Sequence, residues 1–220
     1  MLQLSRNNAN DLYVEALKYL SAQNNLVEHK GVRYLEISPM LLINTNPKKR
    51  LITDAPRKWD ESKARAEFNW YMSGSNLVED IIKDLPRWAD FSDDGVHINS
   101  AYGYLWKPQI NPLVAKIKDD LYTRQAVVTL YDGNKFLSYN GKDTICTVSI
   151  QFIYRDGALH MHVNMRSNDL IWGYCNDQYS FSMLHELICM LTKLPVGTYY
   201  HYATSMHIYE RHWHLLKKEK

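Results

Sequence analysis

The stretch from residue 124 to residue 166 constrains the fold most, because it contains three consecutive runs that suit β-strands. RQAVVTLYD, TICTVSIQFIYRDG and ALHMHVNMRS are rich in β-branched and aromatic residues, which pack well on a pleated surface. The triplet Arg155-Asp156-Gly157 joins the second run to the third and is typical of a hairpin turn. We therefore expect a sheet with a hairpin in the second half of the chain.

Helical patterns occur on both sides of these strands. Apolar residues recur at helical spacing over residues 10–24, after Asp11 as a possible cap. A second helical pattern covers residues 62–74 and is closed by Gly74. Residues 177–194 have the composition of a long buried helix. We expect three helices in these places.

Two further segments are predicted to be strands. Residues 33–44 form a strand pattern that is interrupted by Pro39, and residues 201–212 return to strand after the long helix. Strands and helices alternate too irregularly for a doubly wound parallel sheet. The predicted fold class is therefore α+β, with a mixed β-sheet and flanking helices.

Length and charge limit the class of protein. A chain of 220 residues with 45% hydrophobic content can bury one sizeable core, so residues 1–220 are predicted to form a single domain. The 26 basic and 24 acidic residues give a formal charge of +2, which provides no general attraction to nucleic acid. We expect that no nucleic acid is needed for activity.

The sequence gives no sign of export, membrane insertion or metal binding. The first residues do not follow the pattern of a signal peptide, and no apolar run approaches the roughly 18 residues of a membrane span. The three cysteines form no CxxC pair, so neither a disulfide framework nor a zinc site is predicted. We expect a cytoplasmic protein without a membrane contact and without a metal.

Cys146 is the first candidate for chemistry. It lies within the predicted strand TICTVSIQF, where a thiol is usually a small hydrophobic residue. Arg166 follows 20 residues later across the hairpin, on a strand that could pair with the cysteine's strand. A guanidinium nearby favours thiolate over thiol and can hold a phosphate by a bidentate fork. Ser167 adds a hydroxyl donor for the same anion.

These residues belong to a longer pattern. Cys146 is followed by VNMRSNDLIWGYCND at 163–177 and by SMHIYERH at 205–212. The pattern closely resembles the active-site signature of the thymidylate synthase superfamily, over about residues 31–214. The resemblance implies that Cys146 adds to ring carbon six of a pyrimidine nucleoside monophosphate, with Arg166 and Ser167 on its phosphate. It also implies 5,10-methylenetetrahydrofolate as the cosubstrate.

The resemblance assigns further roles on matching motifs. Glu67 matches the glutamate of the family's E-x-x-W motif, which organises water and shuttles protons. His207 and Tyr209 alternate on one strand, so both can reach one sugar hydroxyl. The segment WADFSDDGVHINSAYGYLW implies Tyr102 in the catalytic pocket and Trp88 on the folate side. The remaining cofactor-side positions are Asp169, which matches the pterin-binding aspartate, and Gly173.

Asp177 is predicted to read the base. The family's uracil reader is Asn, which accepts from the ring N–H and donates to the carbonyl of uracil. Cytosine reverses both groups, and either a protonated Asp177 or an ionised Asp177 with a protonated cytosine would match it. In the alternative register, shifted by one residue, Asn176 reads the base. Thr147, directly after the cysteine, also resembles the deoxycytidylate hydroxymethylase branch.

The resemblance further implies a homodimer in which two sheets face each other. In the family, paired arginines reach the partner's phosphate, and only Arg124 of this pair is present here. The N-terminal phosphate loop is missing, and either Arg33 or Arg50 could substitute for it. Few residues follow SMHIYERH before Lys220, whereas the family's tail closes over the folate.

The function predicted from these residues is folate-dependent 5-hydroxymethylation of deoxycytidylate (dCMP), in the host cytoplasm if a phage encodes the chain. Within the same class, the alternatives are a thymidylate synthase or a hydroxymethylase acting on deoxyuridylate (dUMP) or CMP. In another class, the alternative is a non-catalytic relative that binds nucleotides or RNA. Intact Cys146, Glu67 and Asp177 argue against a decayed site.

Overall fold

Two β-sheets form the framework of the protein, which a computed structural model describes for residues 1–216. The larger sheet has six strands in the order β1-β4-β9-β7-β6-β5, and the smaller has four in the order β2-β3-β10-β8. The strands of the larger sheet are β1 (Leu2–Arg6), β4 (Met40–Asn44), β9 (Val196–Ala203), β7 (Ala158–Met165), β6 (Thr147–Arg155) and β5 (Val127–Thr129). Those of the smaller sheet are β2 (Leu26–His29), β3 (Val32–Ile37), β10 (Met206–Tyr209) and β8 (Asn168–Asp169).

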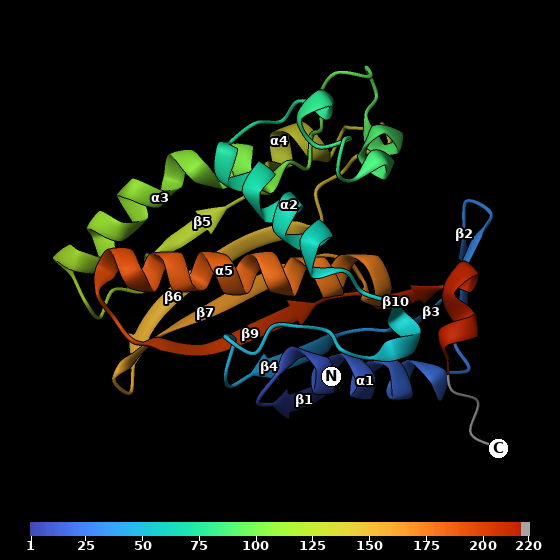
Figure 1. Ribbon diagram of the computed structural model, residues 1–220, viewed down its shortest axis with the longest axis horizontal. Helices are drawn as coiled ribbons and strands as arrows, with labels where there is room; N and C mark the ends of the chain where they lie inside the picture. Colours follow the sequence, from blue (N-terminus) through green and yellow to red (C-terminus); the bar gives the residue numbers. More distant parts are fainter. Residues whose placement is uncertain (217–220) are drawn as a thin grey trace.

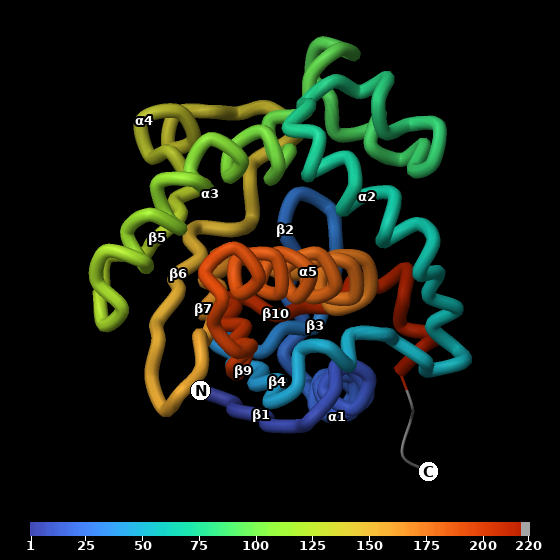
Figure 2. The backbone as a smooth tube through the Cα atoms, turned by 60° about the vertical axis from the view of Figure 1, so that its left-hand side comes forward, coloured from blue at the N-terminus to red at the C-terminus, as the bar shows by residue number. Residues whose placement is uncertain are grey.

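The helices lie over one face of the larger sheet, with α5 running across β6, β7 and β9 (Figures 1 and 2). The α-helices are α1 (Ala9–Ser21), α2 (Glu61–Ser73), α3 (Tyr102–Asp119), α4 (Gly133–Phe136) and α5 (Cys175–Thr192). Short 3₁₀ helices are formed by Ala55–Arg57, Val78–Asp80, Pro86–Phe91 and Glu210–Leu215, and a π-helical turn by Leu170–Tyr174. Parallel pairs, β1 with β4 and β7 with β9, occur beside antiparallel ones. The α+β prediction is therefore confirmed. No helix within residues 1–216 is both long and apolar enough to cross a membrane.

The hairpin and the three predicted helices are present, as α1, α2 and α5. Asp156 and Gly157 have φ angles of 51° and 80° between β6 and β7, the left-handed conformation that tight hairpin turns require. Helix α2 ends at Gly74, whose φ of 75° places it in the left-handed C-cap conformation. Helix α5 buries most of its length, as the sequence predicts.

Three local predictions need correction. Helix α1 is capped by Asn8 rather than Asp11, because the Asn8 side chain accepts from the Asp11 backbone N–H at 2.8 Å. The strand predicted over 33–44 is two strands in different sheets, β3 and β4, separated at Pro39. Residues 201–212 comprise the end of β9, all of β10 and the start of a 3₁₀ helix.

Helix α3 has no counterpart in the sequence prediction, because Pro108 and Pro112 lie inside it and proline usually ends a helix. It nevertheless crosses α2 closely. A Cβ at Gly103 would lie 1.8 Å from the backbone oxygen of Tyr71, so only glycine fits there. This crossing brings Tyr102 of α3 over Tyr71 of α2, with ring centroids 5.2 Å apart.

The other face of the larger sheet has no covering element within the described chain. Along β7 and β9, buried residues alternate with half-buried ones. The half-buried positions include His160, His162, Tyr200 and Tyr202. His162 and Tyr200 stack face to face, with centroids 4.4 Å apart. An aromatic sheet face of this kind suits contact with another protein surface.

Candidate active site

Cys146 lies directly before β6, not in the middle of a strand as the sequence predicted. Its backbone oxygen still accepts from the Arg166 backbone N–H at 2.9 Å, so the two chain segments are paired there. The Arg166 side chain donates to the carbonyl oxygens of Thr144 and Ile145, at 2.8 and 2.9 Å. Its Nη2 atom comes within 3.8 Å of Cys146 Sγ. The guanidinium is thus fixed beside the thiol.

The thiol is held in its neutral form by its surroundings. Burial raises the pKa of Cys146 to about 11, and the nearby Arg166 guanidinium acts in the opposite direction. Among the groups that raise this pKa after burial are the carboxyls of Asp177 and Asp169. A thiolate therefore forms most easily when these carboxyls carry a proton.

Asp177 lies in the first turn of α5 and is 8% exposed. Its Oδ2 atom accepts from Asn168 Nδ2 at 2.7 Å. Burial raises the pKa of Asp177 well above its usual range, and the neighbouring Glu67 carboxyl raises it further. Asp177 is thus a carboxyl that stays protonated more easily than a surface carboxyl, as the sequence analysis required of a neutral cytosine reader.

Glu67 projects from α2 and is only 5% exposed. Its two oxygens accept from the Tyr71 hydroxyl and from Asn176 Nδ2, each at 2.7 Å. Asn176 in turn accepts from Trp59 Nε1 at 2.9 Å. Burial raises the pKa of Glu67. The side chain of Asn176 therefore serves Glu67, while that of Asp177 is hydrogen-bonded to Asn168 and Tyr102.

Tyr102 completes the wall between these groups. It is 6% exposed and stacks between Tyr71 and Phe181. Burial raises the pKa of its hydroxyl well above the usual range, and the nearby Asp177 carboxyl and Cys146 thiol raise this pKa further. Thr147 is fully buried. The sequence-predicted residues Cys146, Tyr102, Glu67 and Asp177 therefore lie together, although they come from three helices and the segment before β6.

His207 and Tyr209 lie on β10, as the alternation predicted. Their rings are 4.8 Å apart, and Tyr34 of the neighbouring strand β3 contacts both. Burial lowers the pKa of His207 to about 4, so the imidazole is neutral at neutral pH. Ser167 lies half-buried between Arg166 and β8.

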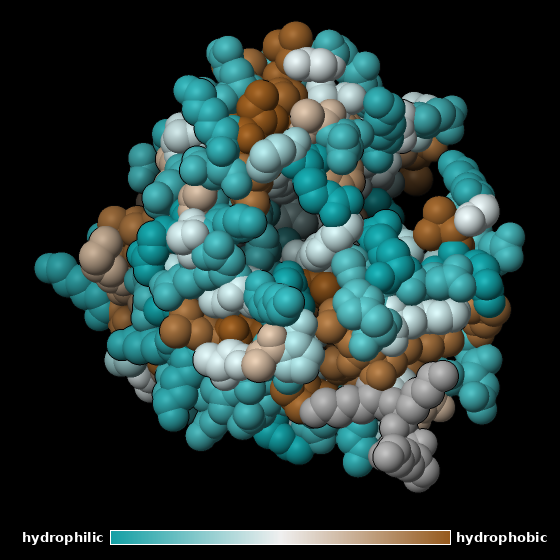
Figure 3. Space-filling view, turned by 45° about the vertical axis from the view of Figure 1, so that its right-hand side comes forward, coloured by the Kyte–Doolittle hydropathy of each residue, from teal (hydrophilic) through white to brown (hydrophobic). Residues whose placement is uncertain are grey.

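Asp169 caps the π-helical turn Leu170–Tyr174 by accepting from the Ile171 N–H at 2.9 Å. Trp172 in this turn is held between two guanidinium groups, with Arg87 3.5 Å and Arg211 4.2 Å from its ring centroid. Neither arginine was singled out from the sequence. The signal for them was weak, because exposed arginines are common. Figure 3 shows a recess on the face that is turned forward there, bordered largely by hydrophilic side chains.

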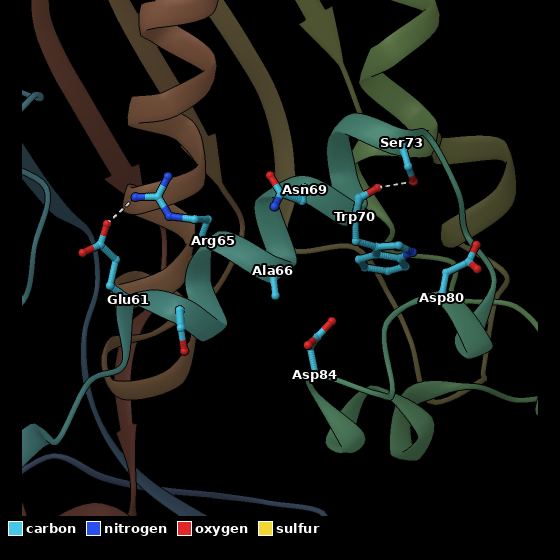
Figure 4. Close-up of a pocket in the computed structure, with 9 residues that line it drawn as sticks. Glu61, Arg65, Ala66, Asn69, Trp70, Ser73, Asp80 and Asp84 are labelled. Atoms are coloured by element: carbon cyan, nitrogen blue, oxygen red, sulfur yellow. Dashed lines mark hydrogen bonds and ion pairs between the residues drawn. The ribbon is translucent and has the colours of Figure 1, made fainter.

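Trp88 packs against Trp70, with ring centroids 5.1 Å apart, and against Phe91. A separate open cavity of 790 Å³ lies on the outward side of α2, where Asp80 and Asp84 face the helix (Figure 4). Its lining includes Trp70 but none of Cys146, Arg166 and Asp177. This cavity is therefore distinct from the site around the thiol.

The arginines considered for the phosphate have other partners. Arg50 forms an ion pair with Glu186 of α5 at 2.7 Å, and Arg33 pairs with Glu210 at 2.9 Å. Arg124 is exposed just before β5. Its predicted reach to a partner's phosphate stays a prediction. Gly173 lies against Asn168 and Asp177, since a Cβ there would be 2.7 Å from Asn168 Nδ2 and 3.3 Å from Asp177 Oδ2.

Sequence comparisons identify the family of this chain. The profile of the thymidylate synthase family matches residues 41–219. The chain belongs to the thymidylate synthase family. Within residues 1–216, no group of three or more His, Cys, Asp or Glu residues is arranged to hold a metal ion.

Several relatives are phage enzymes. The chain is 30% identical to the deoxyuridylate hydroxymethyltransferase of Pseudomonas phage M6, over 96% of this chain and 62% of the relative. The same enzyme of Bacillus phage SP01 is 30% identical over 95% and 59%. The deoxycytidylate 5-hydroxymethyltransferase of Enterobacteria phage T4 is 27% identical over 90% and 84%. The chain thus spans about three fifths of the length of the first two relatives.

Proposed function

We propose that this protein transfers a hydroxymethyl group from a folate to carbon five of dCMP. The proposal is supported most by Asp177, a buried carboxyl beside Cys146, Tyr102 and Glu67. It stands at the position where the family has an amide that reads uracil. A carboxyl that keeps its proton can donate to the ring nitrogen of cytosine and accept from its amine. An ionised Asp177 only accepts, so it would face the carbonyl of uracil without a donor.

The order of events follows from the site. Arg166 and Ser167 bind the phosphate, and His207 and Tyr209 bind the sugar. Cys146 adds as thiolate to ring carbon six, which makes carbon five a nucleophile. A proton on the ring nitrogen next to Asp177 takes up the charge that this addition develops. Glu67, held by Tyr71 and Asn176, orders the water and moves protons at carbon five.

Methylenetetrahydrofolate supplies the one-carbon unit at the oxidation level of formaldehyde. The residues present fit a folate. The carboxyl of Asp169 can hold the pterin, and the half-buried Trp88 offers a flat face to its aromatic rings. Arg87 and Arg211, which flank Trp172, are suited to the negative charge of the glutamate part. Water in place of hydride would then complete the product.

A homodimer is part of the proposal. The uncovered face of β7 and β9 carries half-buried aromatic side chains, including His162 and Tyr200. A second copy of this face would cover it and would bring Arg124 of one protomer toward the other. Gel filtration with light scattering would measure the mass, and a monomer at micromolar concentration would contradict this part.

The second candidate is hydroxymethylation of dUMP. It is favoured by the names of the two relatives at 30% identity, which are both deoxyuridylate enzymes. Incubation with dCMP, dUMP or CMP plus methylenetetrahydrofolate, followed by mass analysis, decides between the two. A product heavier by one CH₂O unit from dCMP supports our proposal. The same product from dUMP alone would replace it with the second candidate, and a CH₂ increment would indicate methylation.

A further inference from the structure

A chain of buried hydrogen bonds runs from Asp177 into the core. Asn168 Nδ2 donates to Asp177 Oδ2 at 2.7 Å, and Asn168 Oδ1 lies 2.9 Å from His201 Nε2. His201 Nδ1 lies 2.6 Å from the Tyr199 hydroxyl. The exposed fractions of Tyr199, His201 and Asn168 are 2%, 1% and 3%. These three residues, which we call the relay, have no direct path to solvent water.

Three elements hold the relay in place. Tyr199 and His201 lie on the buried face of β9, two residues apart and therefore on the same side. Asn168 lies on β8, where it follows the phosphate-binding pair Arg166 and Ser167. Gly173 leaves room for the Asn168 amide because it has no Cβ. The relay therefore links the core of the larger sheet to the base-reading carboxyl.

The direction of these hydrogen bonds is set at the Tyr199 end. Among the described residues, His201 Nδ1 is the hydrogen-bond partner of the Tyr199 hydroxyl, so the hydroxyl proton has its acceptor there. The Tyr199 hydroxyl then donates, and His201 must carry its proton on Nε2. Because burial lowers the pKa of His201 to about 3, the ring holds one proton and has one tautomer. Asn168 consequently turns its oxygen to His201 and its N–H to Asp177.

The reverse direction leaves a donor unpaired. If Asn168 turned its amide around, His201 would donate from Nδ1 to the Tyr199 oxygen. The hydroxyl proton of Tyr199 would then lose its acceptor inside the core. An unsatisfied buried donor is costly compared with a satisfied one. The observed direction is therefore favoured whether or not a nucleotide is bound.

We propose that Tyr199 and His201 are positioning residues that fix an Asn168 N–H on Asp177 and thereby drive the Asp177 proton onto the ring nitrogen of cytosine. This inference rests on the proposed function. A hydrogen bond to a carboxyl oxygen stabilises the ionised form. When cytosine binds, the proton passes from the Asp177 carboxyl to the ring nitrogen, and the carboxylate keeps its bond from Asn168. A protonated ring nitrogen makes carbon six more electrophilic toward Cys146.

The relay acts among several other titratable groups. Those that face Asp177 are Glu67 and Tyr71 of α2, Tyr102 of α3, Asp169 of β8, Tyr199 of β9, and the thiols of Cys146 and Cys175. On the proposed function, Cys146, Glu67 and Tyr102 serve either nucleotide alike. Their titration therefore affects kcat/KM for dCMP and kcat/KM for dUMP equally. The ratio of these two constants then changes with pH through the titration of Asp177.

The test measures this ratio against pH in the full chain. Tyr199→Phe removes the hydroxyl and keeps the ring, so the fold survives. We expect the ratio to fall at least tenfold. The pH at which the ratio is lost should shift upward, because the ionised carboxyl of Asp177 is less well stabilised. His201→Met should behave in the same way. His201→Gln retains an amide donor for Asn168 and should restore most of the ratio.

The matched control is Tyr13→Phe. The Tyr13 hydroxyl is equally buried but has no hydrogen-bond partner among the described residues, so this variant should leave the ratio and its pH dependence unchanged. ¹⁵N spectra of labelled histidine give a second measurement that needs no activity. His201, assigned by its loss in His201→Gln, should carry its proton on Nε2 alone, and Tyr199→Phe should mix the two tautomers.

The outcomes separate the two proposals. A wild-type chain that turns over dCMP, with the same ratio in Tyr199→Phe, would refute the relay and leave the proposed function standing. A wild-type chain without activity on dCMP would refute the proposed function. In that case the ¹⁵N measurement of the His201 tautomer still tests the relay, and a proton on His201 Nδ1 would overturn it.

Discussion

Asp177→Asn is the substitution that tests the base-reading argument most directly. It replaces one carboxyl oxygen by NH₂ and changes the volume of the side chain very little. Asn168 Nδ2 still requires an acceptor at 2.7 Å, so the new amide must turn its oxygen toward Asn168. Its NH₂ group then faces the pocket, where it can donate to the carbonyl of uracil and opposes the amine of cytosine.

The size of the effect follows from burial. Asp177 is 8% exposed, so water cannot easily satisfy a mismatched group. Each unpaired buried polar group costs about 1–3 kcal/mol, and the cytosine edge presents two such groups. A cost of about 2 kcal/mol or more corresponds to a loss of about 30-fold, since about 1.4 kcal/mol is a factor of ten. We expect kcat/KM for dCMP to fall at least tenfold and that for dUMP to rise.

The assay measures both specificity constants by product mass, in the variant and in the wild type. Asp84→Asn is the matched control, because it makes the same chemical change on the wall of the cavity outside α2 (Figure 4). It should alter neither constant. If Asp177→Asn leaves the ratio of the two constants unchanged, Asp177 does not read the base, and the choice of cytosine over uracil loses its physical basis.

Three other changes test the site and its surroundings. Cys146→Ser should abolish turnover and the exchange of the hydrogen at carbon five, measured by tritium release, while dCMP binding persists; continued exchange would exclude Cys146 as the nucleophile. Arg166→Ala should weaken nucleotide binding by about 1.5–3 kcal/mol, measured by calorimetry, and an equal loss for the nucleoside would contradict the phosphate role. Burial lowers the pKa of His185 to about 4, below the roughly 6.5 of an unfolded chain. As the pH falls, the unfolded state therefore binds a proton at His185 before the folded state does. The stability contribution of His185, up to about 3 kcal/mol, is present above about pH 6.5 and is lost as the pH falls from there through about 4. Urea unfolding should show a flatter pH dependence in His185→Gln, and equal slopes for both proteins would oppose this.

Elements that depend on neighbours in sequence were predictable. The turn at Asp156 and Gly157 needs only two residues that tolerate a left-handed backbone. Helix α2 and its cap at Gly74 follow in the same way from local pattern. Helix α3 was not predictable, because Pro108 and Pro112 argue against a helix locally. Its packing against α2 at Gly103 outweighs that preference, and such packing is invisible to a local reading.

The sequence predicts a set of candidate site residues but not their geometry. The motif around Cys146 placed that thiol within a strand, whereas it lies just before β6, where the chain is free to turn its side chain to Arg166. Asn176 and Asp177 are adjacent and both polar, so the sequence left their roles open. Their helical neighbours favour Asp177 as the base reader, since successive residues on a helix point about 100° apart and, of the two, Asn176 donates to Glu67.

The relay shows most clearly what the sequence withholds. His201 and Tyr199 have the alternation of any half-buried strand, and a histidine on such a strand is usually structural. What distinguishes them is their tertiary surroundings. Their strand β9 pairs in parallel with β7, and β8 lies beside β10, where the Asn168 N–H donates to the Ser205 carbonyl oxygen. That arrangement places an amide from β8 between a strand histidine and a helix carboxyl. We therefore propose that specificity at Asp177 depends on the Tyr199 hydroxyl, three residues away along a hydrogen-bonded path and 22 positions away in the sequence.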